Sequence, residues 1–244
     1  MRVIEVKDLF IRYKTLTPIS IKKTLLQFKK SKAKTFEAVK GVSFDIEGGE
    51  IVGLIGSNGS GKSTLLRAIA GIFSPDSGSI NTFGHSVSLL SVGTGFQNQL
   101  SGRDNIYLSG LLLGFTEKQI SENIDKIIDF SELGEYIDMP VRSYSSGMYS
   151  RLSFSITAIM ESDIILIDEV FSVGDAKFKK KSYEKMKSII TDEKKTVILV
   201  SHSMNTIRKL CNRVIWLQNG QINKIGETNT VIEDYEQAMG ITKN

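Results

Sequence analysis

A glycine-rich octapeptide restricts what this chain can fold into more than any other feature of its sequence. Residues 56–63 are GSNGSGKS, and they follow the uninterrupted apolar run Ile51–Ile55. The segment Lys62–Ala70 after them has a helical pattern, which Gly71 ends. This order predicts a buried strand joined to a helix by a tight glycine turn. Successive N–H groups of such a turn converge on phosphate oxygens, aided by the helix N-terminus, so the segment predicts a phosphate-binding loop.

The octapeptide matches the pattern G-x-x-x-x-G-K-[ST] of nucleotide-binding loops. In this pattern the lysine, here Lys62, bridges the β- and γ-phosphates, and the next hydroxyl, here Ser63, ligates Mg²⁺. A plain glycine turn is the alternative, but the strand and helix context disfavours it. ATP and Mg²⁺ are therefore the expected ligands. The residues expected to contact the nucleotide are Gly56, Ser57, Asn58, Gly59, Ser60, Gly61, Lys62, Ser63 and Thr64.

A second apolar run, Ile164–Ile167, ends in the two carboxylates Asp168 and Glu169. Burying unpaired charges is costly, so both carboxylates are expected at the open carboxyl end of a central strand. In isolation a solvated strand end would be the better explanation of these carboxylates, but the phosphate loop favours a nucleotide site. We expect Asp168 to hold the Mg²⁺ shell and Glu169 to orient or deprotonate the attacking water.

A third motif indicates the family. Residues 144–148, YSSGM, resemble the signature loop of ABC ATPases, usually LSGGQ, with Ser145 and Gly147 kept and Ser146 and Met148 departing from it. The resemblance extends from Val3 to about Met239. It implies a homodimer in which Ser145 and Gly147 close, in trans, the nucleotide site of the opposite subunit.

The same resemblance implies roles for residues that no single pattern would reveal. Asp175, in the D-loop-like SVGD at 172–175, is expected at the dimer contact, and His202 resembles the switch histidine near the γ-phosphate. Gln97 is the best candidate for the Q-loop glutamine, which contacts Mg²⁺ and faces the membrane partner, with Gln99 as its rival. The expected catalytic residues are Lys62, Glu169 and His202, and the expected metal ligands are Ser63, Gln97 and Asp168.

Two aromatic residues compete for stacking on adenine. Tyr13 directly ends the first predicted strand, Arg2–Tyr13, whereas Phe36 begins the second, Phe36–Ile46. Tyr13 fits the family position better. Either ring could instead belong to the hydrophobic core.

Alternating strands and helices predict an α/β fold with a parallel sheet. Helical patterns cover 105–133, with Ile120, Ile124, Ile127 and Ile128 on one face, and the segment after the serine-rich loop up to Met160. Further predicted elements are strands at Val197–Val200 and Val214–Leu217, a turn at Asn219-Gly220, a short strand and a helix at Thr230–Met239. The resemblance implies one ABC-type P-loop ATPase domain over 1–244. Its parts are an N-terminal antiparallel β-subdomain with the P-loop of a RecA-like parallel core (1–97), an inserted α-helical subdomain (98–160), and the core completion with a C-terminal helix (161–244).

The composition is that of an ordinary globular protein, with 244 residues and 41% hydrophobic residues. The single cysteine, Cys211, excludes an internal disulfide framework and a cysteine-clustered metal site. No apolar run reaches the roughly 18–20 residues that span a bilayer, and the N-terminus lacks a secretory signal, so a cytoplasmic protein is expected.

The net charge of +4 is local. Eight basic residues and no acidic one lie between Asp8 and Glu37. Thr17-Pro18 and the spacing of Ile21, Leu25 and Phe28 predict a short amphipathic helix there. The segment is either a solvated insertion or a helix that docks on a permease and anionic lipid through Lys22, Lys23, Lys29 and Lys30. Few aromatic residues accompany it, so no nucleic-acid partner is expected.

The motifs also resemble one subfamily, the polysaccharide export ATPases that partner two copies of an ABC-2-type permease. Residues 95–106, GFQNQLSGRDNI, are most similar to teichoic-acid exporters, with O-antigen and capsule export as the alternative. The chain ends at Asn244, short of the C-terminal additions of some relatives, so substrate choice is expected in the permease. A peripheral place on the cytoplasmic face of the membrane follows. A soluble ABC-type ATPase on ribosomes or DNA and a weakly catalytic regulatory subunit are the remaining alternatives.

Overall fold

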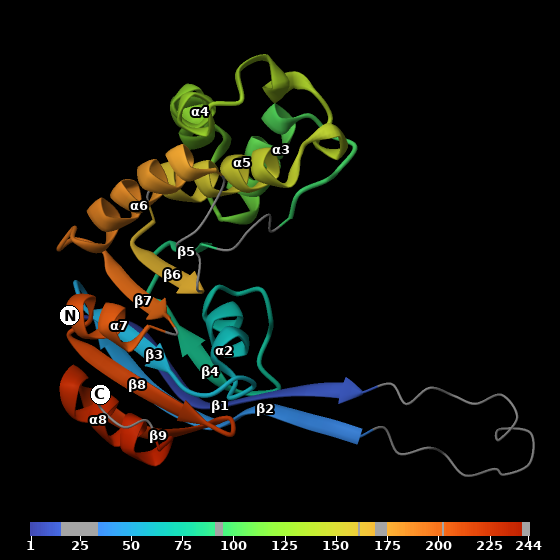
Figure 1. Ribbon diagram of the computed structural model, residues 1–244. Coiled ribbons are helices and arrows are strands. Elements are labelled where there is room, and N and C mark those ends of the chain that lie inside the picture. The colour runs from blue at the N-terminus through green and yellow to red at the C-terminus, as the bar shows by residue number, and fades with distance from the viewer. Residues whose placement is uncertain (16–33, 91–94, 161, 169–174, 202, 241–244) are drawn as a thin grey trace, which may run out of the picture.

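The computed structural model describes residues 1–15, 34–90, 95–160, 162–168, 175–201 and 203–240 of the chain (Figure 1). Two β-sheets lie face to face at one end of the molecule, and a helical layer lies beyond the β5 edge of the larger sheet. The predicted helix in the basic segment, together with Glu169 and His202, lies outside the described residues. No helix in the described ranges is long and apolar enough to cross a membrane.

The larger sheet has six strands in the order β5-β6-β7-β3-β8-β9. Neighbouring strands are parallel from β5 to β8, whereas β9 returns antiparallel to β8 through the predicted turn at Asn219-Gly220. The strands are β3 (Ile51–Ile55), β5 (Val87–Leu90), β6 (Ile164–Asp168), β7 (Thr196–Val200), β8 (Arg213–Gln218) and β9 (Gln221–Glu227). The predicted parallel α/β core is confirmed, and the glycine-loop strand β3 lies inside it.

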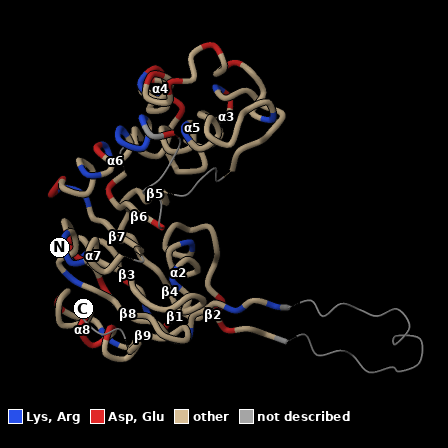
Figure 2. The backbone as a smooth tube through the Cα atoms, viewed as in Figure 1, with Lys and Arg blue, Asp and Glu red and all other residues tan. Residues whose placement is uncertain are grey.

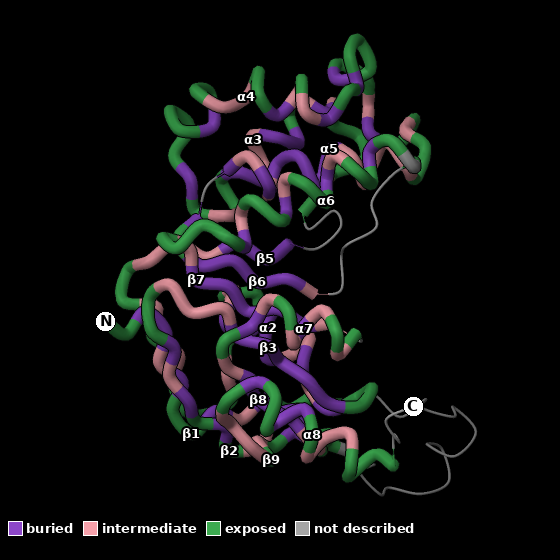
Figure 3. Tube along the Cα trace, turned by 60° about the vertical axis from the view of Figure 1, so that its left-hand side comes forward, coloured by how far each residue is buried: buried purple, intermediate pink, exposed green. Residues whose placement is uncertain are grey.

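Alternating side chains of the central strands divide the core into two layers. On β7, Ile198 and Val200 join one hydrophobic cluster, whereas Val197 and Leu199 join the cluster on the opposite face. Because both faces are covered, every residue of β7 is buried (Figure 3). This explains why the sequence of this strand shows an uninterrupted apolar run rather than an alternating pattern.

A three-stranded antiparallel sheet, in the order β2-β1-β4, covers one layer of the core. It consists of β1 (Arg2–Thr15), β2 (Lys34–Glu47) and β4 (Ser77–Asn81). Its apolar residues share a cluster with α2 (Lys62–Ile69), the helix after the glycine loop. The two predicted N-terminal strands are confirmed and are slightly longer than their sequence patterns indicated.

The other layer of the core contains α6 (Ala176–Ile190), α7 (Met204–Leu210) and α8 (Thr228–Ala238). Phe178, Ile207 and Val231, one from each helix, are fully buried in the same cluster. Arg208 on α7 donates two hydrogen bonds to the Glu236 carboxylate on α8, at 3.0 and 2.9 Å. The predicted helix 230–239 is confirmed, and it starts two residues earlier.

The helical region predicted at 105–133 consists of two helices, α3 (Gly102–Leu112) and α4 (Glu117–Ser131). Gly114 adopts a positive φ of 86°, which ends the first helix, and Thr116 forms a capping box with Gln119 that begins the second. These turn residues interrupt the helical backbone, although the apolar periodicity of the sequence continues across them. The predicted face is nevertheless correct, because Ile120 and Ile127 are fully buried in a third cluster.

This third cluster also contains residues of α5 (Ser146–Ile159), which begins in the predicted serine-rich loop, and Ile137 of the 3-10 turn Gly134–Asp138. A second 3-10 turn, Val141–Ser143, leads into that loop. Strands β4 and β5 and helices α6 and α7 carry no sequence prediction. Helix α6 is unusually lysine-rich, and Figure 2 shows basic residues gathered along it. Its apolar positions are too sparse to stand out in the sequence.

Candidate nucleotide site

The glycine loop leaves β3 through backbone conformations that suit only glycine. Gly56 and Gly61 have φ values of 148° and 107°. A Cβ atom on Gly56 would lie 2.1 Å from the carbonyl oxygen of Leu217, and one on Gly61 would lie 2.4 Å from the carbonyl oxygen of Ala38. The neighbouring strands therefore press directly on this loop and fix its path. A side chain at either position would displace the backbone.

The ammonium group of Lys62 points back into the turn. Lys62 Nζ donates hydrogen bonds to the carbonyl oxygens of Gly56, at 2.8 Å, and Ser57, at 3.0 Å. Ser60 is buried, and its hydroxyl has no hydrogen-bond partner among the described residues. No acidic residue occupies the first turn of α2. The loop thus combines a glycine turn, one ammonium group and a helix N-terminus without a nearby carboxylate, and this set of groups fits phosphate oxygens.

A depression of about 540 Å³ lies in front of the loop. Tyr13 and Phe36 face each other across β1 and β2, with exposed fractions of 38% and 55%. The Tyr13 hydroxyl lies 3.3 Å from Thr64 Oγ1. From the sequence, these two rings are alternative candidates for stacking on adenine. In the structure both line the same depression. Its lining consists of Tyr13, Phe36, Ala38, Asn58, Gly59, Gly61, Lys62, Ser63, Thr64 and Asp168.

Asp168 reaches the same depression from the carboxyl end of β6. In register it lies opposite Val200, the last residue of β7, so the carboxyl ends of both strands meet at one edge of the sheet. This is the edge at which parallel α/β sheets bind ligands. Strand β3 leads the glycine loop to this edge as well. The predicted neighbourhood of the loop and Asp168 is therefore present in the fold.

A separate pocket of about 410 Å³ contains the signature-like residues. Ser145 is the N-cap of α5, and its hydroxyl accepts a hydrogen bond from the Met148 N–H at 3.2 Å. Asp175 is the N-cap of α6 and pairs with Arg151 of α5. The Phe178 N–H, followed by the charge of Arg151, holds the pKa of Asp175 below its ordinary value. Ser145, Gly147 and Asp175 line this pocket together with Arg151.

The two pockets have no lining residue in common. Within one chain, the signature serine is therefore not part of the depression at the glycine loop. Gln97 lines neither pocket, and it is exposed, as is its rival Gln99. The backbone of Gln97 is instead held by the side chain of Asn105, through two hydrogen bonds of 2.7 and 3.1 Å.

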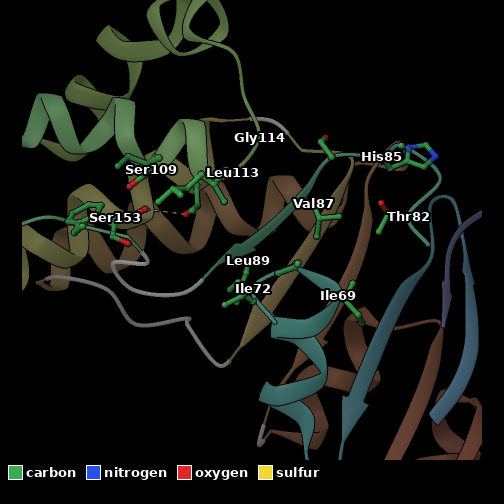
Figure 4. Close-up of a pocket in the computed structure, with 18 residues that line it drawn as sticks. Ile69, Ile72, Thr82, His85, Val87, Leu89, Ser109, Leu113, Gly114 and Ser153 are labelled. Atoms are coloured by element: carbon green, nitrogen blue, oxygen red, sulfur yellow. Dashed lines mark hydrogen bonds between the residues drawn. The ribbon is translucent and has the colours of Figure 1, made fainter. Parts of the chain in front are cut away.

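A groove of about 480 Å³ separates the core from the helical layer (Figure 4). Ile69 and Ile72, from the end of α2 and the turn after it, lie on one side, and Leu113 lies on the other. Val87 and Leu89 of β5 lie between them. Ile72 and Leu112 on its rim expose 45% and 64% of their surface, so the groove presents apolar side chains to solvent.

Comparison with known proteins identifies the family. Residues 39–172 match the family model described as ABC transporter. The chain belongs to the ABC transporter family. This ABC cassette is 44% identical to the O-antigen export system ATP-binding protein RfbB of Klebsiella pneumoniae, over 87% of the chain and 86% of RfbB. It is also 44% identical to the teichoic acids export ATP-binding protein TagH of Enterococcus faecalis, over 94% of the chain and 53% of TagH.

Solved ABC cassettes share the fold. A dimeric post-hydrolysis structure of the ATP-binding cassette MJ0796 with ADP and Pi superposes with a TM-score of 0.67, over 92% of this chain and 98% of that one, at 20% identity. The ATP-binding subunit of another ABC transporter gives a TM-score of 0.68, over 99% of this chain and 95% of that one, at 21% identity. The predicted family and fold class are thus confirmed, and the cassette is an ABC-type ATPase.

Two side chains of this ABC ATPase that hold predicted site residues carry no signal in a sequence motif. Arg151 pairs with Asp175, and Asn105 bonds the backbone of Gln97. The available signals were an arginine and an asparagine on helices with buried faces. A polar residue on such a face needs partners. The sequence alone does not indicate which groups those partners are.

Proposed function

We propose that this chain is the ATP-binding and ATP-hydrolysing subunit of an exporter and works as a homodimer. The observation that carries the proposal is the shared depression of the glycine loop and Asp168. Lys62 and the loop amides offer the donors for the phosphates, and Tyr13 or Phe36 offers a ring for the adenine. Ser63 and Asp168, with Gln97, would hold Mg²⁺, which neutralises the charge that develops on the transferred phosphoryl group.

The separate signature pocket supports head-to-tail pairing of two copies. Ser145 lies at the N-terminus of α5, where backbone N–H groups and the helix dipole favour an anion. Gly147 follows in the first turn, and Asp175 lines the same pocket. Because the glycine-loop depression of the same chain lacks these residues, a second copy would supply them in trans. Its Asp175 would then lie at the dimer contact.

Two further catalytic roles are proposed for residues that lie outside the described ranges. Glu169 directly follows Asp168 and would orient or deprotonate the attacking water. His202 follows β7 by two residues and would contact the γ-phosphate. Both strands end at the edge of the sheet where Asp168 lies. The sequence positions therefore suit the proposed roles.

The apolar groove at the helical layer suits a membrane permease of the ABC-2 type, in two copies per homodimer. Phe96 lies in the groove directly before Gln97, so an occupant of the groove would contact the loop that carries a proposed metal ligand. We further propose that 1–97, 98–160 and 161–244 are the β-subdomain with the P-loop core, the helical subdomain and the core completion. The groove lies between the first two. It would therefore respond to any relative movement of these parts.

The cargo that we propose is a lipid-linked cell-surface polymer, with wall teichoic acid as the first candidate. The loop sequence at 97–102, QNQLSG, supports that choice. O-antigen or capsular polysaccharide is the second candidate, supported by the equal identity to RfbB and TagH. The subunit would lie on the cytoplasmic face of the cell membrane. Its lysine-rich segment would add contacts to anionic lipid, at about 1 kcal/mol for each lysine near the surface.

The catalytic assignment is tested with Glu169→Gln in the full chain. We expect a variant that binds ATP, accumulates as a dimer with Mg²⁺ and ATP, and shows less than about 1% of the wild-type turnover, in line with the 10²–10⁴-fold effect of a general base. ATPase assays and light scattering measure both properties. Glu193→Gln, the same change at an exposed turn, is the matched control. Wild-type turnover by the Glu169 variant would exclude it as the base.

The transport assignment needs a separate experiment. Purification from membranes tests whether the chain copurifies with a polytopic permease, and Lys62→Ala tests whether surface polymer is lost with ATP hydrolysis. Copurification with ribosomes or DNA, without a permease, would favour a soluble ABC-type ATPase instead. Chemical analysis of the polymer retained in the cell then separates teichoic acid from polysaccharide.

A further inference from the structure

Asn105 is a fully buried polar residue in the first turns of α3. Its side-chain oxygen accepts the Gln97 N–H at 2.7 Å. Its side-chain nitrogen faces three carbonyl oxygens, those of Gln97 at 3.1 Å, Leu100 at 3.3 Å and Ser101 at 2.8 Å. One amide group therefore satisfies both backbone polar groups of Gln97. The same amide also closes the loop between Gln97 and the helix.

Helix capping does not account for these bonds. The N-terminus of α3 already has a complete capping box, in which Ser101 Oγ accepts the Asp104 N–H and the Asp104 carboxylate accepts the Ser101 N–H. Asn105 comes one residue after this box and is not needed to satisfy it. Its amide is instead directed back at the preceding loop. Losing one partner of a buried polar group is costly, so the bonds hold the loop in one conformation.

The loop is also fastened on its other side. The Arg142 N–H donates to the Asn98 carbonyl at 2.9 Å, and the Val141 N–H donates to the Leu100 carbonyl at 2.9 Å. Residues 141–142 lie shortly before Ser145, the N-cap of α5. With both edges bonded, the conformation of the loop is set by the helical layer. The backbone of Gln97 is therefore fixed, whereas its side chain is exposed.

We infer that Asn105 is a positioning residue for Gln97, and this inference rests on the proposed function of Gln97 as a metal ligand. Asn105 lies behind the loop and acts only through the backbone of Gln97. A glutamine on a loose loop would sample many orientations, and the entropy of ordering it would oppose metal binding. By fixing the backbone in advance, Asn105 would remove the part of this entropic cost that comes from ordering the loop.

The first test uses Asn105→Ala and Asn105→Asp in the full chain. Hydrogen exchange of the segment 95–101 is measured by mass spectrometry without nucleotide. Removing the acceptor of the Gln97 N–H in Asn105→Ala should accelerate its exchange at least tenfold. Asn105→Asp keeps an acceptor but loses the donors, so its acceleration should be smaller. Asn123→Asp, the same chemical change on α4, should leave this segment unchanged, and unchanged exchange in Asn105→Ala would overturn the inference.

The second test measures the Mg²⁺ concentration for half-maximal ATP hydrolysis and, independently, Mn²⁺ binding with a non-hydrolysable ATP analogue. We expect Asn105→Asp and Gln97→Ala each to raise the half-maximal Mg²⁺ concentration and the dissociation constant for Mn²⁺ about tenfold. The double variant should show no further shift, and affinity for metal-free ATP should change less than twofold. A shift in Gln97→Ala without one in Asn105→Asp overturns the positioning role alone. No shift in Gln97→Ala overturns both this inference and the proposed metal role of Gln97.

Discussion

The rings of Phe96 and Tyr149 lie 4.9 Å apart, centroid to centroid, at an interplanar angle of 55°. Phe96 belongs to the apolar groove and precedes Gln97, whereas Tyr149 lies in the first turns of α5 and donates its N–H to the Ser145 carbonyl. One aromatic contact thus connects the groove and the Gln97 loop with α5, the helix whose N-cap is Ser145. Any occupant that moves Phe96 would also act on the helix that begins after Ser145.

This contact predicts energetic coupling between two loops that are far apart in the sequence. In a double-mutant cycle with Phe96→Leu and Tyr149→Leu, we expect a coupling free energy of about 1 kcal/mol in thermal or denaturant unfolding. We also expect each variant to weaken the stimulation of ATP hydrolysis by the permease more than basal hydrolysis. If the effects of the two substitutions are additive, both on the free energy of unfolding and on the stimulation of ATP hydrolysis, the ring contact does not couple the two loops.

The paired rings of Tyr13 and Phe36 predict a shared adenine site. Base stacking on an aromatic ring is worth about 1–3 kcal/mol, so replacing the stacking ring by alanine should weaken ATP binding about tenfold or more. Fluorescence titration of Tyr13→Ala and Phe36→Ala separates the two candidates. Phe83→Ala, another exposed aromatic outside the depression, is the control. Unchanged affinity in both single variants and in the double variant would place the adenine elsewhere.

The lysine-rich segment predicts a defect that is specific to export. Changing Lys22, Lys23, Lys29 and Lys30 together to Glu should reduce polymer export at least fivefold, because repulsion replaces attraction at an anionic surface, worth about 1 kcal/mol for each lysine. Basal ATP hydrolysis should stay within twofold. The matched control changes four exposed lysines of 179–194, Lys179, Lys180, Lys187 and Lys194, to Glu. Equal loss of export and hydrolysis would refute the membrane role.

Burial of Cys211 predicts a stability change at alkaline pH. Desolvation raises the pKa of its thiol from 9.0 to about 12. Above pH 9 the unfolded chain therefore releases this proton while the folded chain keeps it, so stability is lost as the pH rises toward 12. The free energy of unfolding should fall about 1.4 kcal/mol per pH unit more steeply in the wild type than in Cys211→Ala. Urea unfolding between pH 8 and 10.5 measures both slopes, and parallel slopes would contradict the raised pKa.

The parts of the fold that could be predicted are those whose conformation depends on a few consecutive residues. The conformation of Gly56 and the buried run of β3 are properties of a few consecutive residues, so their pattern is visible in the sequence. Helix α6 is not visible in this way. Its surface is lysine-rich, and its buried residues, such as Phe178, are recognisable only once the sheet beneath them is known.

In the candidate site, too, some residues could be predicted from the sequence and others could not. Predicted residues gather where strand order brings them together, as Asp168 and the glycine loop do. The side chains that hold the others in place, Asn105 behind Gln97 and Arg151 beside Asp175, depend on contacts across 8 and 24 positions between different elements. Such pairings are decided by tertiary packing. A motif specifies which residues contact a ligand, but it does not specify what supports them.

The central position of β3 in the sheet affects how the protein can fold during its synthesis on the ribosome. This strand, at residues 51–55, pairs with β7 and β8, which are synthesised more than 140 residues later. Until those strands leave the ribosome, both edges of β3 lack their partners, and the carbonyl of Leu217 that presses on Gly56 does not yet exist. A nascent chain therefore lacks the neighbouring strands that fix the glycine loop, and its apolar β3 stays without strand partners, as an aggregation-prone segment, until translation is nearly complete.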